Sequence, residues 1–186
     1  MSVAEIREFV QRACQAEANI FGPAFFRQHV GVVAECCAQL AKCLRADAEV
    51  VELAAHLHDL SAVCDPATLP NHAQASAEMA VQILSERGYS SAGVAAVARA
   101  IASHSEPLAP GISSPEEVCL SNADAAARII RPAYWLYFAF VVRKQGFAEG
   151  RQWLRLLFER QWGMLVEPAR ELIGARYAAT IELLSH

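Results

Sequence analysis

The sequence has little of what marks fibrous, disordered or nucleic-acid-binding proteins. Only 9 of its 186 residues are glycine and 8 are proline, while 54% of the residues are hydrophobic. This composition is typical of a folded globular protein. Basic residues form no cluster, and the 16 lysines and arginines are outnumbered by 20 aspartates and glutamates. Because a nucleic-acid polymer requires a basic surface, we expect no partner of that class.

The sequence also lacks a segment that is long and apolar enough to cross a membrane. Its longest apolar run, residues 133–142, is about half of the ~20 residues that a spanning helix needs. The first eight residues carry two glutamates where a signal peptide has a basic region. We therefore expect no membrane partner and a cytoplasmic location.

The cysteines show no Cys-x-x-Cys pair and no disulfide framework of a small secreted domain. We expect all six to be reduced, buried side chains that pack as small apolar residues. These residues are Cys14, Cys36, Cys37, Cys43, Cys64 and Cys119.

Apolar residues recur at intervals of three and four along nearly the whole chain, whereas sustained period-two alternation is missing. This pattern predicts an all-α fold. Ser2-x-x-Glu5 and Ser114-Pro115-Glu116-Glu117 have the residues of capping boxes and mark two helix starts. The predicted helices lie near residues 3–17, 24–45, 48–60, 72–87, 91–104, 115–130, 133–145, 148–161 and 165–184.

These segments predict one domain over residues 1–186, a single helical bundle of about eight or nine helices. Two loops are expected, at Ser61 to Asn71 and at Ser105 to Ser113, because each contains two prolines. Both loops follow histidines. The aromatic-rich part of the chain, residues 134–162, is expected to form a helical cap over the earlier bundle.

Asp59 is a carboxylate that needs a partner. It follows His58 near the end of residues 50–60, a segment that is apolar on nearly every helical face. A buried, unpaired carboxylate is strongly destabilising, so Asp59 must meet a cation, a metal ion or several hydrogen-bond donors. No lysine or arginine lies between Arg45 and Arg87. His58 and Asp59 are therefore a candidate pair of metal ligands.

Further histidines and a second aspartate lie on apolar helical faces. His29 and His104 continue apolar stripes, His72 begins a helix, and Asp124 follows Leu120 on a buried face. Each of these alone is more typical of a hydrogen-bonded core residue. Their combination, with few basic residues nearby, favours a metal site with nitrogen and oxygen ligands. The candidate ligands are His29, His58, Asp59, His72, His104 and Asp124.

The order His29, His58-Asp59 and Asp124 resembles that of the HD superfamily of metal-dependent phosphohydrolases, which is named after its adjacent His-Asp pair. The most specific segment is residues 51–60, an apolar helix that ends in His-Asp. His-Ala-x-x-Ser-Ala-Glu, which begins at residue 72, and Ala-Ile-Ala-Ser-His, which ends at residue 104, match the two extra histidines of dinuclear members. The layout is most similar to small bacterial members that hydrolyse dinucleoside polyphosphates or related nucleotides.

The resemblance implies an all-α core over about residues 24–131, with helices in 133–184 completing or capping the bundle. The family often follows its His-Asp pair with x-Gly/Ala-Lys, whereas this chain has Leu-Ser-Ala-Val at residues 60–63. A lysine that would contact phosphate is therefore missing. The resemblance implies a first metal bound by His29, His58, Asp59 and Asp124, and a second bound by His72 and His104 with Asp59 bridging.

A site of this kind predicts a metal-dependent phosphohydrolase that acts on a small phosphorylated metabolite, a nucleotide. Its nitrogen and oxygen ligands suit one or two ions of Fe, Mn, Co or Ni. Such ions would supply an activated hydroxide, with Asp59 and His58 as the catalytic ligands. Arg128 and Arg131 stand four and seven residues after Asp124, so we expect them to bind phosphate from the same helical face.

Two alternatives from other functional classes remain open. The first is an HD-type di-iron oxygenase that cleaves a C–C or C–P bond, because such proteins resemble this ligand set and the lysine is missing. The second is a non-catalytic, metal-stabilised binding module. The sequence also leaves open whether the chain forms a homodimer.

Overall fold

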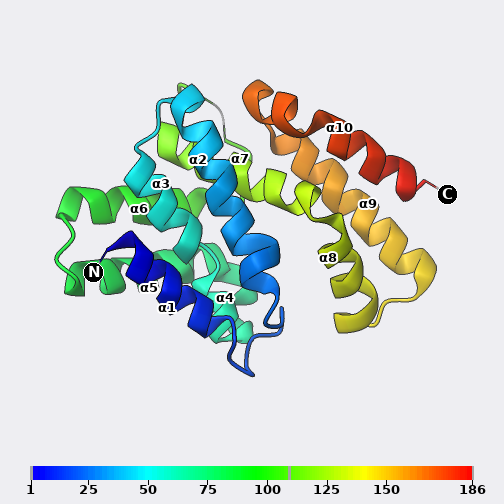
Figure 1. Cartoon of the computed structure of the whole chain (residues 1–186), viewed down its shortest axis with the longest axis horizontal. Coiled ribbons are helices and arrows are strands. Elements are labelled where there is room, and N and C mark those ends of the chain that lie inside the picture. The colour runs from blue at the N-terminus through cyan, green and yellow to red at the C-terminus, as the bar shows by residue number, and fades with distance from the viewer. Residues whose placement is uncertain (1, 109, 186) are drawn as a thin grey trace.

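Helices make up the regular structure of the residues that the computed structural model describes, which are 2–108 and 110–185 (Figure 1). Within those ranges no strand is present, and the all-α prediction is confirmed. Ala109, inside the second expected loop, lies outside the described residues, as do Met1 and His186. The elements are α1 (Val3–Ala13), η1 (Phe26–Val30), α2 (Gly31–Leu44), α3 (Ala48–Leu57), α4 (Leu60–Cys64), η2 (Pro66–Asn71), α5 (His72–Glu86), α6 (Ser91–Ser103), α7 (Pro115–Ile130), α8 (Pro132–Tyr137), η3 (Phe138–Val142), α9 (Phe147–Met164) and α10 (Glu167–Leu183).

Side-chain caps define the starts of several helices. Both predicted capping boxes form, at Ser2 for α1 and at Ser114 for α7. The carboxylate of Asp47 accepts hydrogen bonds from two backbone N–H groups at the start of α3, and Ser90 caps α6. Asp47 also connects two helix starts, because its own N–H donates to the side chain of Glu116 in α7.

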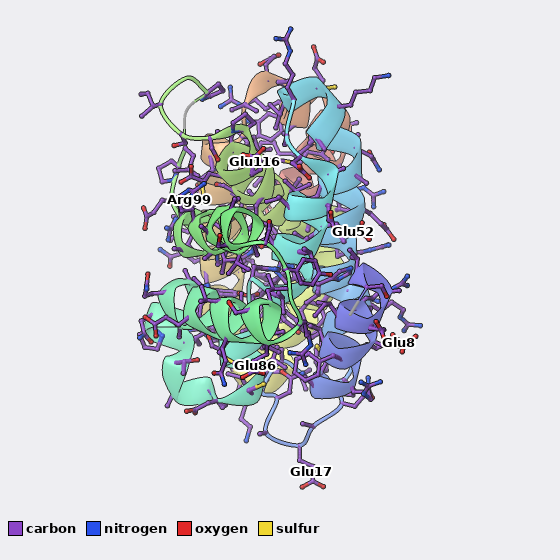
Figure 2. All side chains as sticks on the ribbon, turned by 90° about the vertical axis from the view of Figure 1, so that its left-hand side faces the viewer. Glu8, Glu17, Glu52, Glu86, Arg99 and Glu116 are labelled. Carbon is purple, nitrogen blue, oxygen red and sulfur yellow. The ribbon has the colours of Figure 1, made fainter. Side chains whose placement is uncertain are left out.

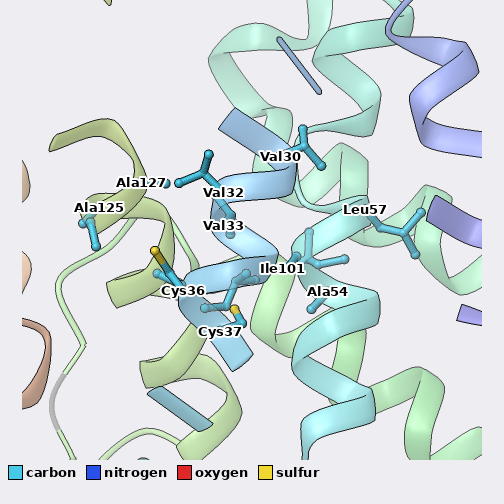
Figure 3. Packing of buried hydrophobic residues seen from close by; sticks show 14 of the residues in the cluster. Val30, Val32, Val33, Cys36, Cys37, Ala54, Leu57, Ile101, Ala125 and Ala127 are labelled. Carbon is cyan, nitrogen blue, oxygen red and sulfur yellow. The ribbon is translucent and has the colours of Figure 1, made fainter. Parts of the chain in front are cut away.

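α7 is the central helix of the molecule. It packs against α2, α3 and α6 on one side and against α9 and α10 on another, so that α8–α10 lie together beside the first six helices (Figure 1). All residues of α7 from 118 to 127 are buried. Figure 3 shows part of the core between these helices, where small alanines of α7 allow close approach of α2. The labelled side chains are Val30, Val32, Val33, Cys36, Cys37, Ala54, Leu57, Ile101, Ala125 and Ala127.

The structure corrects the expected loop from Ser61 to Asn71. This segment contains α4 and the 3-10 helix η2 instead. Proline is compatible with the first turn of a helix, and Pro66 stands there in η2, where the side chain of Asp65 accepts from the N–H of Ala67 at 2.9 Å. Pro66 thus begins a short helix, which also contains Pro70.

The prediction that all cysteines are buried is wrong for two of them. Cys43 and Cys64 are exposed, whereas the other four are buried and all six are free thiols. Cys43 lies near the end of α2, and Cys64 is the last residue of α4. Both positions are at helix ends, where helical spacing predicts burial poorly.

No single helix in 2–108 and 110–185 is long and apolar enough to cross a membrane. α7 and the segment Pro132–Val142 reach that length and composition only as a pair, which is bent by 75°. α7 itself is buried by the surrounding helices.

Candidate metal centre

Two aspartates are buried in the interior, unlike the acidic side chains of the surface. Acidic side chains such as Glu8, Glu17 and Glu52 are exposed (Figure 2), but Asp59 is only 5% exposed and Asp124 only 2%. Such burial requires compensating positive charge or hydrogen-bond donors. The structure places histidines around both carboxylates.

His58 and Asp59 occupy the break between two helices. His58 caps the C-terminus of α3, and Asp59, with φ −110° and ψ 9°, stands at the start of α4. The helical path is interrupted there, so the two adjacent side chains turn toward each other. Nε2 of His58 lies 3.3 Å from Oδ2 of Asp59.

The first group of candidate ligands comes from η1, from the break between α3 and α4, and from α7. His29 belongs to the π-helix η1, a type of turn that is frequent at functional sites. Its Nε2 lies 3.4 Å from Oδ2 of Asp59 and 3.1 Å from Oδ1 of Asp124, and Nε2 of His58 is 3.3 Å away. His29, His58, Asp59 and Asp124 therefore surround one point.

The second group shares Asp59 with the first. His72 begins α5 and His104 caps α6, and their Nε2 atoms lie 3.5 Å and 3.8 Å from Oδ1 of Asp59. His104 is fully buried, whereas the side chain of His72 is 20% exposed and stands at the edge of the centre. Each oxygen of Asp59 thus faces a different pair of imidazoles.

Backbone carbonyls determine how three of the rings present their nitrogens. Nδ1 of His58, His72 and His104 each lies within 2.9 Å of the carbonyl oxygen three residues earlier. A carbonyl only accepts, so each Nδ1 carries the proton and donates it. With a metal bound, Nε2 of each ring would present its lone pair to the ion, which is the state in which imidazole binds a metal.

The electrostatics of the centre fit a bound cation. Burial disfavours a proton on His58, but the carboxylates of Asp59 and Asp124, together with the hydrogen bond to the backbone of Ala55, outweigh burial and raise the pKa of His58 to about 9. Burial alone would raise the pKa of Asp59, yet His58 and His29 hold it well below its usual range. Burial lowers the pKa of His104 to about 4, so this ring is a neutral donor. The cluster stabilises positive charge at its middle, as a divalent ion would supply.

The two expected phosphate-binding arginines lie in different surroundings. Arg128 forms two contacts with Asp124, from Nη2 to Oδ2 at 3.0 Å and from Nε to Oδ1 at 3.3 Å, and lies over the ring of Trp135. Arg131 is exposed and caps the C-terminus of α7 with φ −117° and ψ 56°. Helical register ends before Arg131, so the two arginines do not share a face as the sequence predicts.

A cavity of about 270 Å³ opens beside the second group of ligands. Among the described residues, Arg128 lines this cavity and Arg131 does not. Sequence reasoning missed the contribution of α9, because its apolar spacing resembles that of any core-facing helix. The cavity is lined by Leu69, Pro70, His72, Ser105, Asp124, Arg128, Leu157, Arg160, Gln161 and Met164.

Comparison with known proteins identifies the family. The model of the HD domain matches residues 26–129, which is more than half of the chain. No curated protein matches the chain. A predicted HD superfamily hydrolase from an uncultured Thermotogales bacterium is 25% identical with a TM-score of 0.66, over 98% of this chain and 88% of that one. YpgQ of Bacillus subtilis, solved in complex with ADP, shares the fold with a TM-score of 0.75 at 21% identity, over 99% and 94% of the two chains. The chain belongs to the HD domain family.

Proposed function

We propose that this protein is a metal-dependent phosphohydrolase that acts on a small phosphorylated metabolite, a nucleotide. The observation that carries the proposal is the position of Asp59 between two pairs of histidines. Its Oδ2 faces His29 and His58, and its Oδ1 faces His72 and His104. A carboxylate placed in this way can bridge two ions.

The chain's own residues would hold and orient the metal. His29, His58, Asp59 and Asp124 would bind the first ion, and His72 and His104 would complete a second site with Asp59. When bound, such ions lower the pKa of a coordinated water and polarise a phosphoryl oxygen. The ligand set suits Fe, Mn, Co or Ni.

The cavity supports a substrate that carries a phosphate. Its lining includes the candidate ligands His72 and Asp124 and two arginines, Arg128 and Arg160. Arginine is well suited to phosphate because its planar fork donates two parallel hydrogen bonds. The complex of YpgQ with ADP is consistent with a nucleotide ligand in this fold.

Ser61 takes no part in phosphate binding in this proposal, although it follows the His-Asp pair closely. Its hydroxyl donates to the carbonyl oxygen of His72 at 3.1 Å, and its N–H donates to Ser76 at 3.1 Å. These bonds, one buried and one partly buried, connect α4 to α5. The segment after Asp59 therefore positions His72, and positive charge for the substrate comes from the arginines.

Metal content and turnover test the proposal together. Protein purified without chelator is expected to contain about two transition-metal ions per chain and to hydrolyse members of a panel of nucleotides and phosphoesters with Mn²⁺ or Fe²⁺. Asp59→Asn should lose metal and turnover, while Asp65→Asn, which changes an exposed aspartate between α4 and η2, should keep both. Full metal content in Asp59→Asn would contradict the bridging role of Asp59. Absence of turnover in the wild-type protein would instead favour the non-catalytic, metal-stabilised binding module.

The oxygenase is the second candidate, favoured by the two groups of ligands and by the missing lysine. It uses the same six residue types but requires O₂. We expect turnover to be equal in aerobic and anaerobic assays. Two irons with strictly O₂-dependent turnover would favour the oxygenase over hydrolysis.

A further inference from the structure

One face of α9 forms a wall of the cavity beside the metal centre. Leu157, Arg160, Gln161 and Met164 line the cavity at the spacing of a single helical face. α9 packs against α7 on the side of the molecule that carries α8 and α10 (Figure 1). It lies outside residues 26–129, so the HD domain match assigns nothing to these side chains.

Gln161 is a buried polar residue on this wall. It is only 5% exposed, and its Oε1 has no hydrogen-bond partner among the residues that the structure describes. A buried amide without a partner is destabilising, and almost all buried polar groups in proteins are paired. Leu157 and Met164, which line the cavity from the same face, are apolar. The carboxamide is therefore explained by a ligand that donates a hydrogen bond to it.

Arg160 offers positive charge that the protein itself does not neutralise. In the described part of the chain its guanidinium makes one hydrogen bond, from Nη2 to the carbonyl oxygen of Ser105 at 3.4 Å. The neighbouring Glu159 is paired with Arg155 at 2.8 Å, and Arg128 is held by Asp124. Arg160 thus keeps donors available for an anion in the cavity.

We infer that α9 recognises the substrate, with Arg160 binding a phosphate group and Gln161 accepting a hydrogen bond from the nucleoside part of a nucleotide. This inference rests on the proposed function, which places the reacting phosphate beside His72 and Asp124. A bare diphosphate lacks the hydroxyl and amino groups of a nucleoside. The two residues therefore have separable roles.

Two ligands that resist hydrolysis separate these roles. Calorimetry on the Mn²⁺-loaded full chain compares α,β-methylene-ADP with methylenediphosphonate, which has the same phosphorus groups without the nucleoside. Arg160→Gln is expected to weaken both ligands about tenfold, because a charge-assisted hydrogen bond is lost from each. Gln161→Leu should weaken α,β-methylene-ADP about tenfold and change methylenediphosphonate by less than about twofold. Arg176→Gln, at an exposed arginine of α10 that does not line the cavity, is the control and should change neither.

Equal weakening of both ligands by Gln161→Leu, or no weakening of either, would overturn the inference. Gln161→Glu keeps an acceptor of nearly the same shape and should retain the preference for α,β-methylene-ADP, with circular dichroism confirming that each variant folds. Binding is measured without turnover. If the protein showed this binding pattern but hydrolysed no phosphate, the proposed function would be contradicted and the assignment of Arg160 and Gln161 to ligand binding would stand. Ribose 5-phosphate identifies the donor, since weakening by Gln161→Leu indicates a ribose hydroxyl and no change indicates an N–H of the base.

Discussion

Arg128 contacts both oxygens of Asp124 and holds this carboxylate beside the histidines. Its Nη2 lies 3.0 Å from Oδ2, while Nε2 of His29 lies 3.1 Å from Oδ1. Burial would raise the pKa of Asp124, but Arg128 and His29 hold it well below its usual range. Arg128 therefore acts on the metal centre through Asp124, in addition to its place in the cavity wall.

We expect Arg128→Gln to weaken metal binding about tenfold, since loss of a partner that orients a ligand typically costs 10–100-fold in affinity, about the range seen for such residues. Titration of metal-free protein with Mn²⁺ measures the change. Arg131→Gln, at an exposed residue of the same helix end, should leave metal affinity unchanged. Unaltered affinity in Arg128→Gln, with only KM raised, would limit Arg128 to phosphate binding.

The candidate ligands were predictable from sequence because a helix fixes the direction of each side chain by its spacing. The apolar stripes that contain His29 and His104 placed both rings inward, and the structure brings them to Asp59. Arg160 and Gln161 were not predictable in the same way. Their place in the cavity depends on how α9 packs against α7, which is a contact between distant parts of the chain.

At the scale of elements, prediction succeeded for long helices and failed for short ones. Periodicity over many residues predicted α5 and α7 nearly to their ends. It missed the π-helices η1 and η3, because one extra residue in a turn leaves the apolar pattern almost unchanged. It also predicted a loop where α4 and η2 lie, because two prolines within a short segment predict a loop more strongly than a few apolar residues predict a helix.

Asn122 connects the central helix to the C-terminal pair. It is fully buried in α7; its Oδ1 accepts from the N–H of Val166, between α9 and α10, at 2.7 Å, and its Nδ2 donates to the carbonyl of Val118 at 2.9 Å. Without the side chain, the N–H of Val166 loses its partner. This bond connects α7 to the start of α10, directly after α9 ends at Met164.

Asn122→Ala is expected to reduce the free energy of unfolding by about 1–3 kcal/mol, the usual cost of leaving a buried donor without a partner. Urea unfolding followed by circular dichroism measures this. Asn71→Ala replaces an exposed asparagine whose side chain makes no capping bond, and it should change stability by less than about 0.5 kcal/mol. Equal midpoints for Asn122→Ala and wild type would show that this connection contributes nothing.

For the whole molecule, thiol accessibility reports how completely the core is packed. Cys43 and Cys64 are exposed, and burial raises the pKa of Cys14 and of Cys36 to about 12. Because the thiolate is the reactive form, buried thiols should react slowly. A thiol reagent is expected to modify two of the six cysteines quickly in native protein and all six after unfolding. Rapid modification of more than two would indicate a core that opens readily.

Metal removal should destabilise the whole fold, because the candidate ligands come from segments that meet only in the folded chain. His29, Asp59 and Asp124 belong to different helices, so an ion bound among them binds the folded state and not the unfolded one. At a metal concentration of about 100 times Kd, such binding contributes about 2.7 kcal/mol. In a chain of this length each kcal/mol corresponds to about 2–4 °C in Tm.

We therefore expect a chelator to lower the Tm of the wild-type protein by roughly 5–10 °C in thermal unfolding followed by circular dichroism. Asp59→Asn removes the shared ligand, so its Tm should be nearly the same with and without chelator. Asp65→Asn, which leaves the centre intact, should respond as the wild type does. If chelator left the wild-type Tm unchanged, no ion would bind the folded centre. If it lowered the Tm of Asp59→Asn by the same amount, the metal would bind elsewhere in the chain.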